Sequence, residues 1–499
     1  MAATKNKVTV FWFVRTSLMF AIVTLLALYL INLYVLHVGT DHYQKVVRDA
    51  AADGSLAKEL PLALGHRTPR YAHEVNDCLT FSMLVYPRTE RPWVKPISSP
   101  VPDRGIAVLP ADALLAKGYP FPGHCSDLYL YLHRPKDVPF SAHYHRYLHG
   151  HYSFIGLLLA FLSLKTATTL CVLLACGLLV FLIFVALLRT RKHRRASQPF
   201  GRDLAFAVLA LYLLFFSGIY PFAYSLNLAD AYLLVWIFLI LSYFRPLCRI
   251  EERNFVMLAL AFGCLTIFIE MNTGEIAIGV IALLLALVFG EATDGKTLVR
   301  RGVLGTFSFL LAVVLCLALK MLVVTAIWGR QELAVFQTTL AVRMGSGDIV
   351  SNLTPRELYF FTRIGVDPSL VERSRIVSSA YSLFKSFYAS FALYYGSAAV
   401  GLLVTTTSWL AAIATNWRAM WTDVSPLVRS ASALLLAASM VAPVWYVIFP
   451  NATTLHTFYF ARPLAWMPPI FLLGVIYRWQ ARTSARAAAT GSQTVSAAN

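Results

Sequence analysis

The sequence predicts an all-α polytopic membrane protein with about ten membrane-spanning helices. The prediction rests on composition and on the recurrence of long apolar runs. Of the 499 residues, 58% are hydrophobic and only 14% are charged, and the mean hydropathy is +0.63. Such values are typical of chains that cross a bilayer several times, and each crossing needs about 20 apolar residues. Apolar runs near this length lie at residues 14–37, 167–189, 203–219, 229–244, 254–270, 275–290, 302–327, 389–413, 430–449 and 463–478.

The basic residues predict how the chain crosses the membrane. The net charge of +18 could suggest a nucleic-acid partner, but Lys and Arg are concentrated in alternate loops. That is the pattern of cytoplasmic loops, so we expect no nucleic-acid partner and place both termini in the cytoplasm. The basic loops are "RTRKHRRASQPFGR", "FRPLCRIEER", "GEATDGKTLVRR", "NWRAMWTDVSPLVR" and "RWQARTSAR", whereas "GIYPFAYSLNLADA" and "EMNTGEI" have no Lys or Arg.

Seven segments follow from this pattern. Lys5 and Lys7 precede the first apolar run and no small-residue cleavage site follows it, so we expect an uncleaved anchor. The first long loop has the length of a small domain, and the second mixes charged and aromatic residues as interfacial helices do. The predicted segments are the anchor at 1–37, an extracytoplasmic loop domain at 38–143, an amphipathic interfacial helix at 144–166, transmembrane helices 2–7 at 167–327, an extracytoplasmic loop with interfacial helices at 328–388, transmembrane helices 8–10 at 389–478 and a disordered cytoplasmic tail at 479–499.

The stretch "YHRYLHGHYSFIGLLLAFLSLKT" begins at Tyr144 and combines histidines and aromatic residues with an apolar run. His145 and His149 are four residues apart and would share a helix face, which permits a metal pair. The HExxH pattern is absent and no acidic ligand is close in sequence. We therefore favour a helix whose polar face lies at the lipid headgroups and borders a substrate entrance.

Acidic candidates gather in the predicted outer segments. Glu74 and Asp77 lie in "HEVNDCLTF", and Asp41 follows the first span. A carboxylate near the membrane surface can take a proton from an acceptor hydroxyl, although for each acid an ordinary loop position is the alternative. Glu270 ends an apolar run at the outer edge of the bilayer, where it is either paired or functional.

Cationic candidates lie on the same side. Lys320 is within the apolar run "LAVVLCLALKMLVVTAIW", where it either snorkels to the surface or meets an anion, and we favour the anion. His456 and Arg462 lie in "NATTLHTFYFARP". Arg suits bidentate contact with phosphate, and an interfacial anchor is the alternative.

Two cysteines share the first long loop. If that loop is extracytoplasmic, Cys78 and Cys125 are candidates for a disulfide, because only that side is oxidising. Two free thiols are the alternative.

The segment from Tyr144 to His151 resembles a motif of the form Tyr-x-Arg-Tyr-Trp-His-Gly-Tyr. This motif is found in a family of polytopic membrane proteins encoded with bacterial polysaccharide genes. Leu148 and His151 depart from it. "NDCLTFSML" resembles the family's conserved Asp region, the span with Lys320 resembles its Lys-containing helix, and "PVWYVIFPNATTLHTFYFAR" resembles its last outer segment with Ala452 in place of a His.

The architecture also resembles the GT-C class of glycosyltransferases, and this resemblance implies a function. The donor would be a polyprenyl-phosphate-linked sugar, the acceptor a saccharide or glycolipid, and the site would face outward from a bacterial inner membrane. Asp77 or Asp41 would be the base for an inverting transfer, with Glu270 a further catalytic candidate. No cofactor is certain and a divalent metal stays open. Substrate contacts are expected from Glu74, His145, Arg146, His149, Lys320, His456 and Arg462.

Other functions remain alternatives. A transporter or flippase of lipid-linked saccharides would show polar residues at mid-membrane and paired repeats. Lys320 is the one strong mid-span charge that we identify and no repeat is evident, so the enzyme is favoured. A polymerase or ligase would share the lipid substrate and the outer site, and a noncatalytic assembly partner also stays open.

Overall fold

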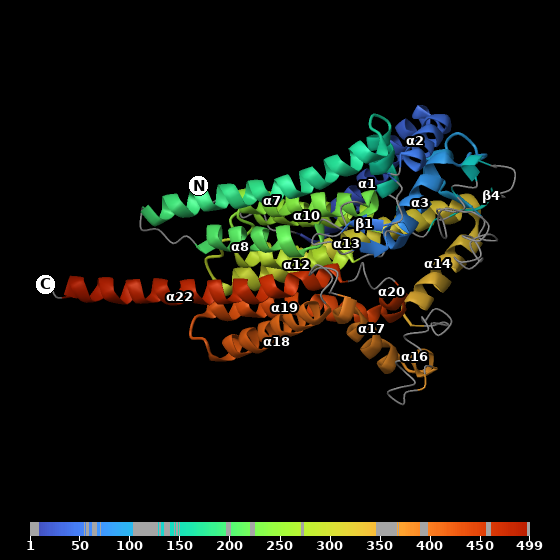
Figure 1. Cartoon of the computed structure of the whole chain (residues 1–499). Coiled ribbons are helices and arrows are strands. Elements are labelled where there is room, and N and C mark those ends of the chain that lie inside the picture. The colour runs from blue at the N-terminus through green and yellow to red at the C-terminus, as the bar shows by residue number, and fades with distance from the viewer. Residues whose placement is uncertain are drawn as a thin grey trace.

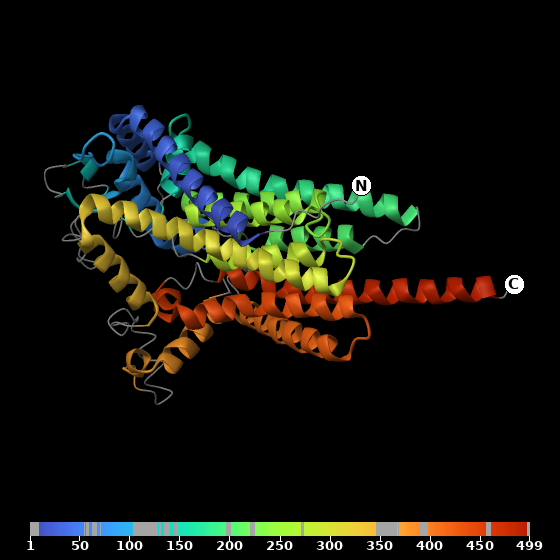
Figure 2. The same cartoon turned by 180° about the vertical axis from the view of Figure 1, so that it is seen from behind.

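The computed structural model is an elongated helical bundle, with shorter helices and strands gathered at one end (Figure 1). We call this end the insert end. The first helix begins, and the last helix ends, on the side away from it (Figures 1 and 2). The described residues are 9–53, 55, 59–61, 67–69, 71–102, 128, 131–133, 140–143, 145, 148, 150–195, 201–219, 225–270, 274–345, 367, 369–389, 398–455 and 461–496.

Long helices form the bundle and confirm the all-α, multi-pass class. Six of the described helices are long and apolar enough to cross a membrane: α1, α7, α11, α13, α18 and α19. The other four expected spans, which lie in α8, α10, α12 and α22, do not meet this criterion. Helices α8 and α12 have 16 and 14 residues, the apolar part of α10 is Leu228–Phe244, and the apolar start of α22 is soon followed by polar residues. The bundle helices are α1 (Val10–Val38), α7 (Leu164–Arg195), α8 (Gly201–Phe216), α10 (Leu226–Phe244), α11 (Glu252–Ile269), α12 (Glu275–Val288), α13 (Gly295–Trp328), α18 (Ala398–Thr422), α19 (Pro426–Ile448) and α22 (Met467–Ser496).

The short helix α12 is the centre of the bundle. All 14 of its residues are buried, and it contacts α10, α11, α13 and α19. A helix that is apolar on every face is stable only where protein or lipid surrounds it completely. Its first residue, Glu275, is therefore a carboxylate held at the end of the core, which positions it for the site described below.

Small residues allow α11 and α13 to approach closely. A Cβ on Gly263 of α11 would overlap the backbone carbonyl oxygen of Phe309 on α13. Gly305 on α13 similarly lies against the ring of Phe255. Such contacts between small residues and backbone are the usual basis of tight packing between membrane helices.

We expect Gly263→Ala to lower the melting temperature of the purified protein. The added methyl group has no room and must push α13 away, and overpacking of this kind costs about 1–3 kcal/mol. Gly177→Ala on α7 is the matched control, because its Cβ would meet nothing within 4 Å. Equal melting temperatures for the two variants would contradict the tight α11–α13 contact.

The insert end combines small helices with two hairpins. Strands β1 and β2 pair antiparallel, with Glu59 opposite Pro69, and β3 and β4 pair with Pro100 opposite His143. Arg88 holds the chain after α3 by donating from Nη1 to Lys95 O and from Nη2 to Met83 O, both at 3.0 Å. The elements here are α2 (Thr40–Ala52), β1 (Glu59–Pro61), β2 (Arg67–Pro69), α3 (Tyr71–Val85), the 3-10 turn η2 (Lys95–Ile97), β3 (Pro100–Pro102), β4 (Phe140–His143) and α6 (Gly150–Leu159).

The predicted amphipathic helix at 144–166 differs from the structure. Only Gly150–Leu159 forms α6, and α7 begins at Leu164. Seven of the ten residues of α6 are buried, including His151 and Tyr152, so it is a packed element and not a surface ledge. Gly150 makes this burial possible, since any side chain there would overlap Phe268 at the end of α11.

The second predicted loop does contain helices outside the bundle. The chain turns sharply at Gly329, whose φ of 97° favours glycine, and enters α14. Figure 2 shows α14 leaving the end of α13 at a steep angle. The elements of this region and the next insert-end turns are α14 (Arg330–Arg343), α16 (Leu370–Arg373), α17 (Arg375–Ala389), α20 (Pro450–Leu455) and the 3-10 helix η6 (Arg462–Trp466).

Two helix ends differ from the predictions. Helix α18 continues to Thr422 because Asn416, beyond the predicted end, is buried and accepts a hydrogen bond from Arg478 of α22 at 2.9 Å. The predicted disordered tail is instead the continuation of α22 to Ser496, which projects past the bundle (Figure 1). Alanine has the highest helix propensity, and "ARAAAT" is rich in it.

Ion pairs join the loops at the end opposite the inserts. Glu291 forms ion pairs with Arg202 at 2.7 Å and with Arg249 at 2.6 Å. Nearby, Asp294 caps α13 by accepting the backbone N–H of Thr297 at 2.8 Å and its hydroxyl at 2.6 Å. These two hydrogen bonds hold the pKa of Asp294 below its usual value.

The cap predicts a pH dependence. A carboxyl whose pKa is lowered by folding stabilises the protein above its unfolded pKa, about 3.9 for Asp, and this contribution disappears as the pH falls below that value. We expect Asp294→Ala to melt below the wild type at pH 7, with a difference that shrinks toward pH 3. Asp294→Asn is the control, because Asn also caps well. A difference independent of pH would contradict a charged cap.

Candidate functional site

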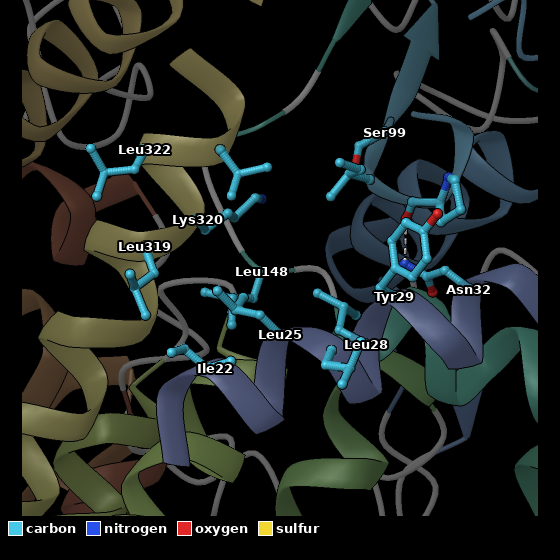
Figure 3. A pocket seen from close by; sticks show the side chains of 14 residues that line it. Ile22, Leu25, Leu28, Tyr29, Asn32, Ser99, Leu148, Leu319, Lys320 and Leu322 are labelled. Atoms are coloured by element: carbon cyan, nitrogen blue, oxygen red, sulfur yellow. Dashed lines mark hydrogen bonds between the residues drawn. The ribbon is translucent and has the colours of Figure 1, made fainter. Parts of the chain in front are cut away.

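A groove between α1 and α13 opens at the insert end of the bundle (Figure 3). Its volume is about 370 Å³. Its walls are mostly aliphatic, and a few polar groups lie along one end and one wall. The labelled lining residues are Ile22, Leu25, Leu28, Tyr29, Asn32, Ser99, Leu148, Leu319, Lys320 and Leu322.

Lys320 supplies the cationic group of this groove. Its side chain comes from α13 and extends into the space between α13 and α1 (Figure 3). The residue is only 4% exposed, and its Nζ has no hydrogen-bond partner in the part of the chain that the structure describes. An unpaired buried ammonium is costly. An anion in the groove would offset that cost.

The polar wall of the groove is fixed by side-chain hydrogen bonds. Asn32 of α1 donates to Pro96 O at 2.8 Å and accepts from the hydroxyl of Ser153 at 2.5 Å. Tyr29 donates to Trp93 O at 3.2 Å. One face of α1 therefore holds both the segment around η2 and helix α6.

His145 anchors the segment that carries Leu148. Its Nδ1 lies 3.2 Å from Glu332 Oε2 on α14, and its ring lies 4.2 Å from the ring of Trp328. Both partners flank the bend at Gly329. The contact holds Leu148 beside Lys320, so His145 serves the groove as a wall support. Sequence reasoning did not identify Glu332, because its partner is 187 positions away.

A second polar group of residues lies among α3, α10, α12 and η6. Asp77 of α3 is 7% exposed, and its Oδ1 accepts a hydrogen bond from Ser225 at 2.9 Å. Ser225 is the residue that precedes α10. The hydrogen bond thus places the Asp77 carboxylate at the start of a buried bundle helix.

The second polar group also contains a buried ion pair between Arg462 and Glu275. Arg462 of η6 and Glu275 of α12 are 1% and 2% exposed on their side chains and are hydrogen-bonded to each other. Glu270, which follows α11, is also buried and accepts the backbone N–H of Ile276 at 2.9 Å. The guanidinium of Arg462 lies 5.8 Å from the ring centre of Tyr232.

Asp230 is an acid of this group that sequence reasoning missed. It is 6% exposed on α10, and Glu275, Arg462 and Asp77 are near enough for their charges to act on it. We name Asp77, Asp230, Glu270, Glu275 and Arg462 the acid cluster. Asp230 could have been found from the sequence by the criterion that identified Lys320, namely an ionisable residue in or beside an apolar run. In the sequence, Asp230 lies at the outer end of the predicted span 229–244 and in the adjoining outer loop, and it was not selected as a candidate.

Helix α6 lies next to both the groove and the acid cluster. It contacts α1, α3, α10 and α11. His151 in its first turn is near enough to Lys320 for the two charges to interact, and Ser153 bonds to Asn32 in the groove wall. Tyr43 of α2 ties this helix to the inserts by donating to Gly156 O at 3.0 Å, and burial raises the pKa of the phenol, so it stays a donor.

Asp41 is not brought to either of these sites, because it is exposed in the first turn of α2. Cys78 is disulfide-bonded, and its predicted partner Cys125 lies outside the described residues. The predicted site residues Arg146, His149 and His456 and the side chain of Glu74 also lie outside the described part of the chain.

Metal binding can be examined only within the described ranges. There, no group of three or more His, Cys, Asp or Glu side chains has the spacing to hold a metal ion.

Helix length and hydropathy define a multi-pass helical membrane protein. At one end, the described residues form a mostly aliphatic groove and a buried acid cluster. Comparison of the chain with protein-family models, curated proteins and solved structures gives no match.

Proposed function

We propose that this protein is a membrane glycosyltransferase that moves a sugar from a polyprenyl-phosphate donor to a saccharide or glycolipid acceptor. The site would be extracytoplasmic, at the insert end, in a bacterial inner membrane with both chain termini in the cytoplasm. The proposal joins the resemblance of the motifs to the chemistry of the groove and the acid cluster.

One observation carries the proposal. The buried Lys320 amine, unpartnered within the described residues, lies in an open groove with aliphatic walls. A free inorganic anion would gain nothing from the aliphatic walls, and a neutral lipid would leave the amine unpaired. A ligand with a long apolar chain and a phosphate satisfies both parts of the groove.

The acid cluster would supply the transfer chemistry. In the proposed step, the oxygen of the acceptor hydroxyl attacks the anomeric carbon of the donor sugar, and the carboxylate of Asp77 takes the hydroxyl proton. The bond from the anomeric carbon to the phosphate oxygen breaks, and the phosphate leaves with the electron pair. Lys320 would stabilise the phosphate charge as it develops. A direct displacement of this kind inverts the anomeric centre.

Native mass spectrometry of the purified protein tests the proposal without a guess about the sugar. A co-purifying polyprenyl phosphate, with or without a sugar, is the expected result. Ordinary phospholipids alone, in a sample that still binds added ligands, would contradict it and favour a noncatalytic assembly partner. If polyprenyl phosphate is bound, proteoliposomes separate transfer of the sugar to an acceptor from movement of the intact lipid across the bilayer, which a flippase would produce.

A further inference from the structure

Only one of the two carboxylate oxygens of the buried Asp230 has a hydrogen-bond donor among the described residues. Its Oδ1 accepts the backbone N–H of the next residue, Ala231, at 2.8 Å. Its Oδ2 is buried and has no hydrogen-bond partner in the described ranges. A buried acceptor without a donor destabilises a folded protein. The described residues supply no donor to Oδ2, so a hydroxyl group of a ligand would be a favourable partner for it.

The groups around Asp230 are engaged elsewhere. Arg462 is hydrogen-bonded to Glu275, and the Ser225 hydroxyl donates to Asp77. Asp230 thus lies within the acid cluster, yet its free oxygen is not used by the neighbours with which its charge interacts.

A second buried Asp in the bundle shows the usual arrangement. Asp203, at the start of α8, is 5% exposed, and its Oδ1 accepts the hydroxyl of Tyr243 at 2.9 Å. That bond links α8 to α10 far from the inserts. Asp203 and Asp230 are both buried aspartates on bundle helices. They differ because Asp203 accepts a hydrogen bond from the side chain of Tyr243, whereas Oδ2 of Asp230 has no donor among the described residues.

We propose that Asp230 is a sugar-contacting, specificity-determining residue, whose Oδ2 accepts a hydrogen bond from a hydroxyl of the sugar carried on the lipid donor. This inference rests on the proposed function. It adds the group that distinguishes a loaded carrier, which is a polyprenyl phosphate linked to a sugar, from the bare carrier, which has no sugar. A site built to accept a hydroxyl rejects a ligand that lacks it, because the buried acceptor is then left unpaired. Lys320 would hold the carrier phosphate in both cases.

The test compares Asp230→Asn with Asp203→Asn in the full-length purified protein. Binding is measured for undecaprenyl phosphate alone and for undecaprenyl phosphate linked to glucose, galactose or mannose. The wild type should bind at least one loaded carrier about tenfold or more tightly than the bare carrier, as expected when the bare carrier leaves a buried acceptor unpaired. Asp230→Asn should lose that preference and keep its affinity for the bare carrier within about twofold.

Thermal stability without ligand separates this role from a structural one. Asp230→Asn should melt at the wild-type temperature or above it, because no side chain in the described ranges donates to Oδ2 and the oxygen of Asn can still accept the Ala231 N–H. Asp203→Asn should melt below the wild type and keep the preference for the loaded carrier. If Asp230→Asn does not fold, the preference of the wild type still tests the inference, and Asp230→Ala gives a second variant.

The outcomes are distinguishable. Equal binding of bare and loaded carriers by the wild type, or an unchanged preference in Asp230→Asn, would overturn the inference and leave the proposed function standing. A fall in melting temperature for Asp230→Asn as large as that for Asp203→Asn would assign Asp230 a structural role. Failure of the wild type to bind any of the four ligands would overturn the proposed function itself.

Discussion

Asp77→Asn should abolish sugar transfer while the protein still inserts and folds. Asn keeps an oxygen that can accept the Ser225 hydroxyl, which now donates to Asp77 at 2.9 Å, so the contact between α3 and α10 survives. What the substitution removes is the group that takes the proton. A positioned general base contributes about 10²- to 10⁴-fold to a rate. We therefore expect a loss of at least that size in transfer measured with native lipid-linked donors, and an unchanged melting temperature.

Asp41→Asn is the matched control for Asp77. The sequence made both acids candidates for the base, but Asp41 is exposed on α2 and Asp77 is buried in the acid cluster. The control should retain wild-type activity. Full activity in Asp77→Asn would remove Asp77 from the mechanism, and loss of activity in Asp41→Asn alone would make Asp41 the base.

Lys320→Met should weaken binding of polyprenyl phosphate without destabilising the protein. Met has a similar length and places an apolar group in a groove with aliphatic walls, so packing is retained. The charge-assisted contact with phosphate is lost, and contacts of this kind contribute about 1.5–3 kcal/mol, which is about 10- to 150-fold in affinity. Because the buried Lys320 amine has no hydrogen-bond partner among the described residues, the variant breaks no such bond, and its melting temperature without ligand should equal or exceed that of the wild type.

Lys165→Met provides the control for Lys320. Lys165 is exposed at the start of α7, so its charge is solvated and its removal should leave affinity unchanged. The measurement is the upward shift in melting temperature that added undecaprenyl phosphate produces, since a ligand that binds only the folded state stabilises it by RT ln(1 + L/Kd), where L is the free ligand concentration. An equal shift in the wild type and in Lys320→Met would identify Lys320 as a snorkelling residue.

The sequence by itself determined the class of the protein and most of its long helices. Hydrophobic runs such as those in α1, α7, α13 and α19 are local properties, and a bilayer requires the backbone of such runs to be helical. For the same reason Lys320 could be recognised without a structure, because a charge within an apolar run is conspicuous in the sequence. Helix ends were less well determined where polar residues are paired by tertiary contacts, as Asn416 is with Arg478.

Only the tertiary structure decided which polar residues share a site. Asp77 meets Ser225 across 148 positions, and Arg462 meets Glu275 across 187. Neither pair has a sequence pattern, because hydrogen bonds between distant helices depend on how those helices pack and not on the residues beside them. The same packing buried α6, left Asp41 in solvent and enclosed Asp230. Hydropathy reports the preference of each segment for lipid or water, whereas the partner of a buried charge is set by the whole bundle.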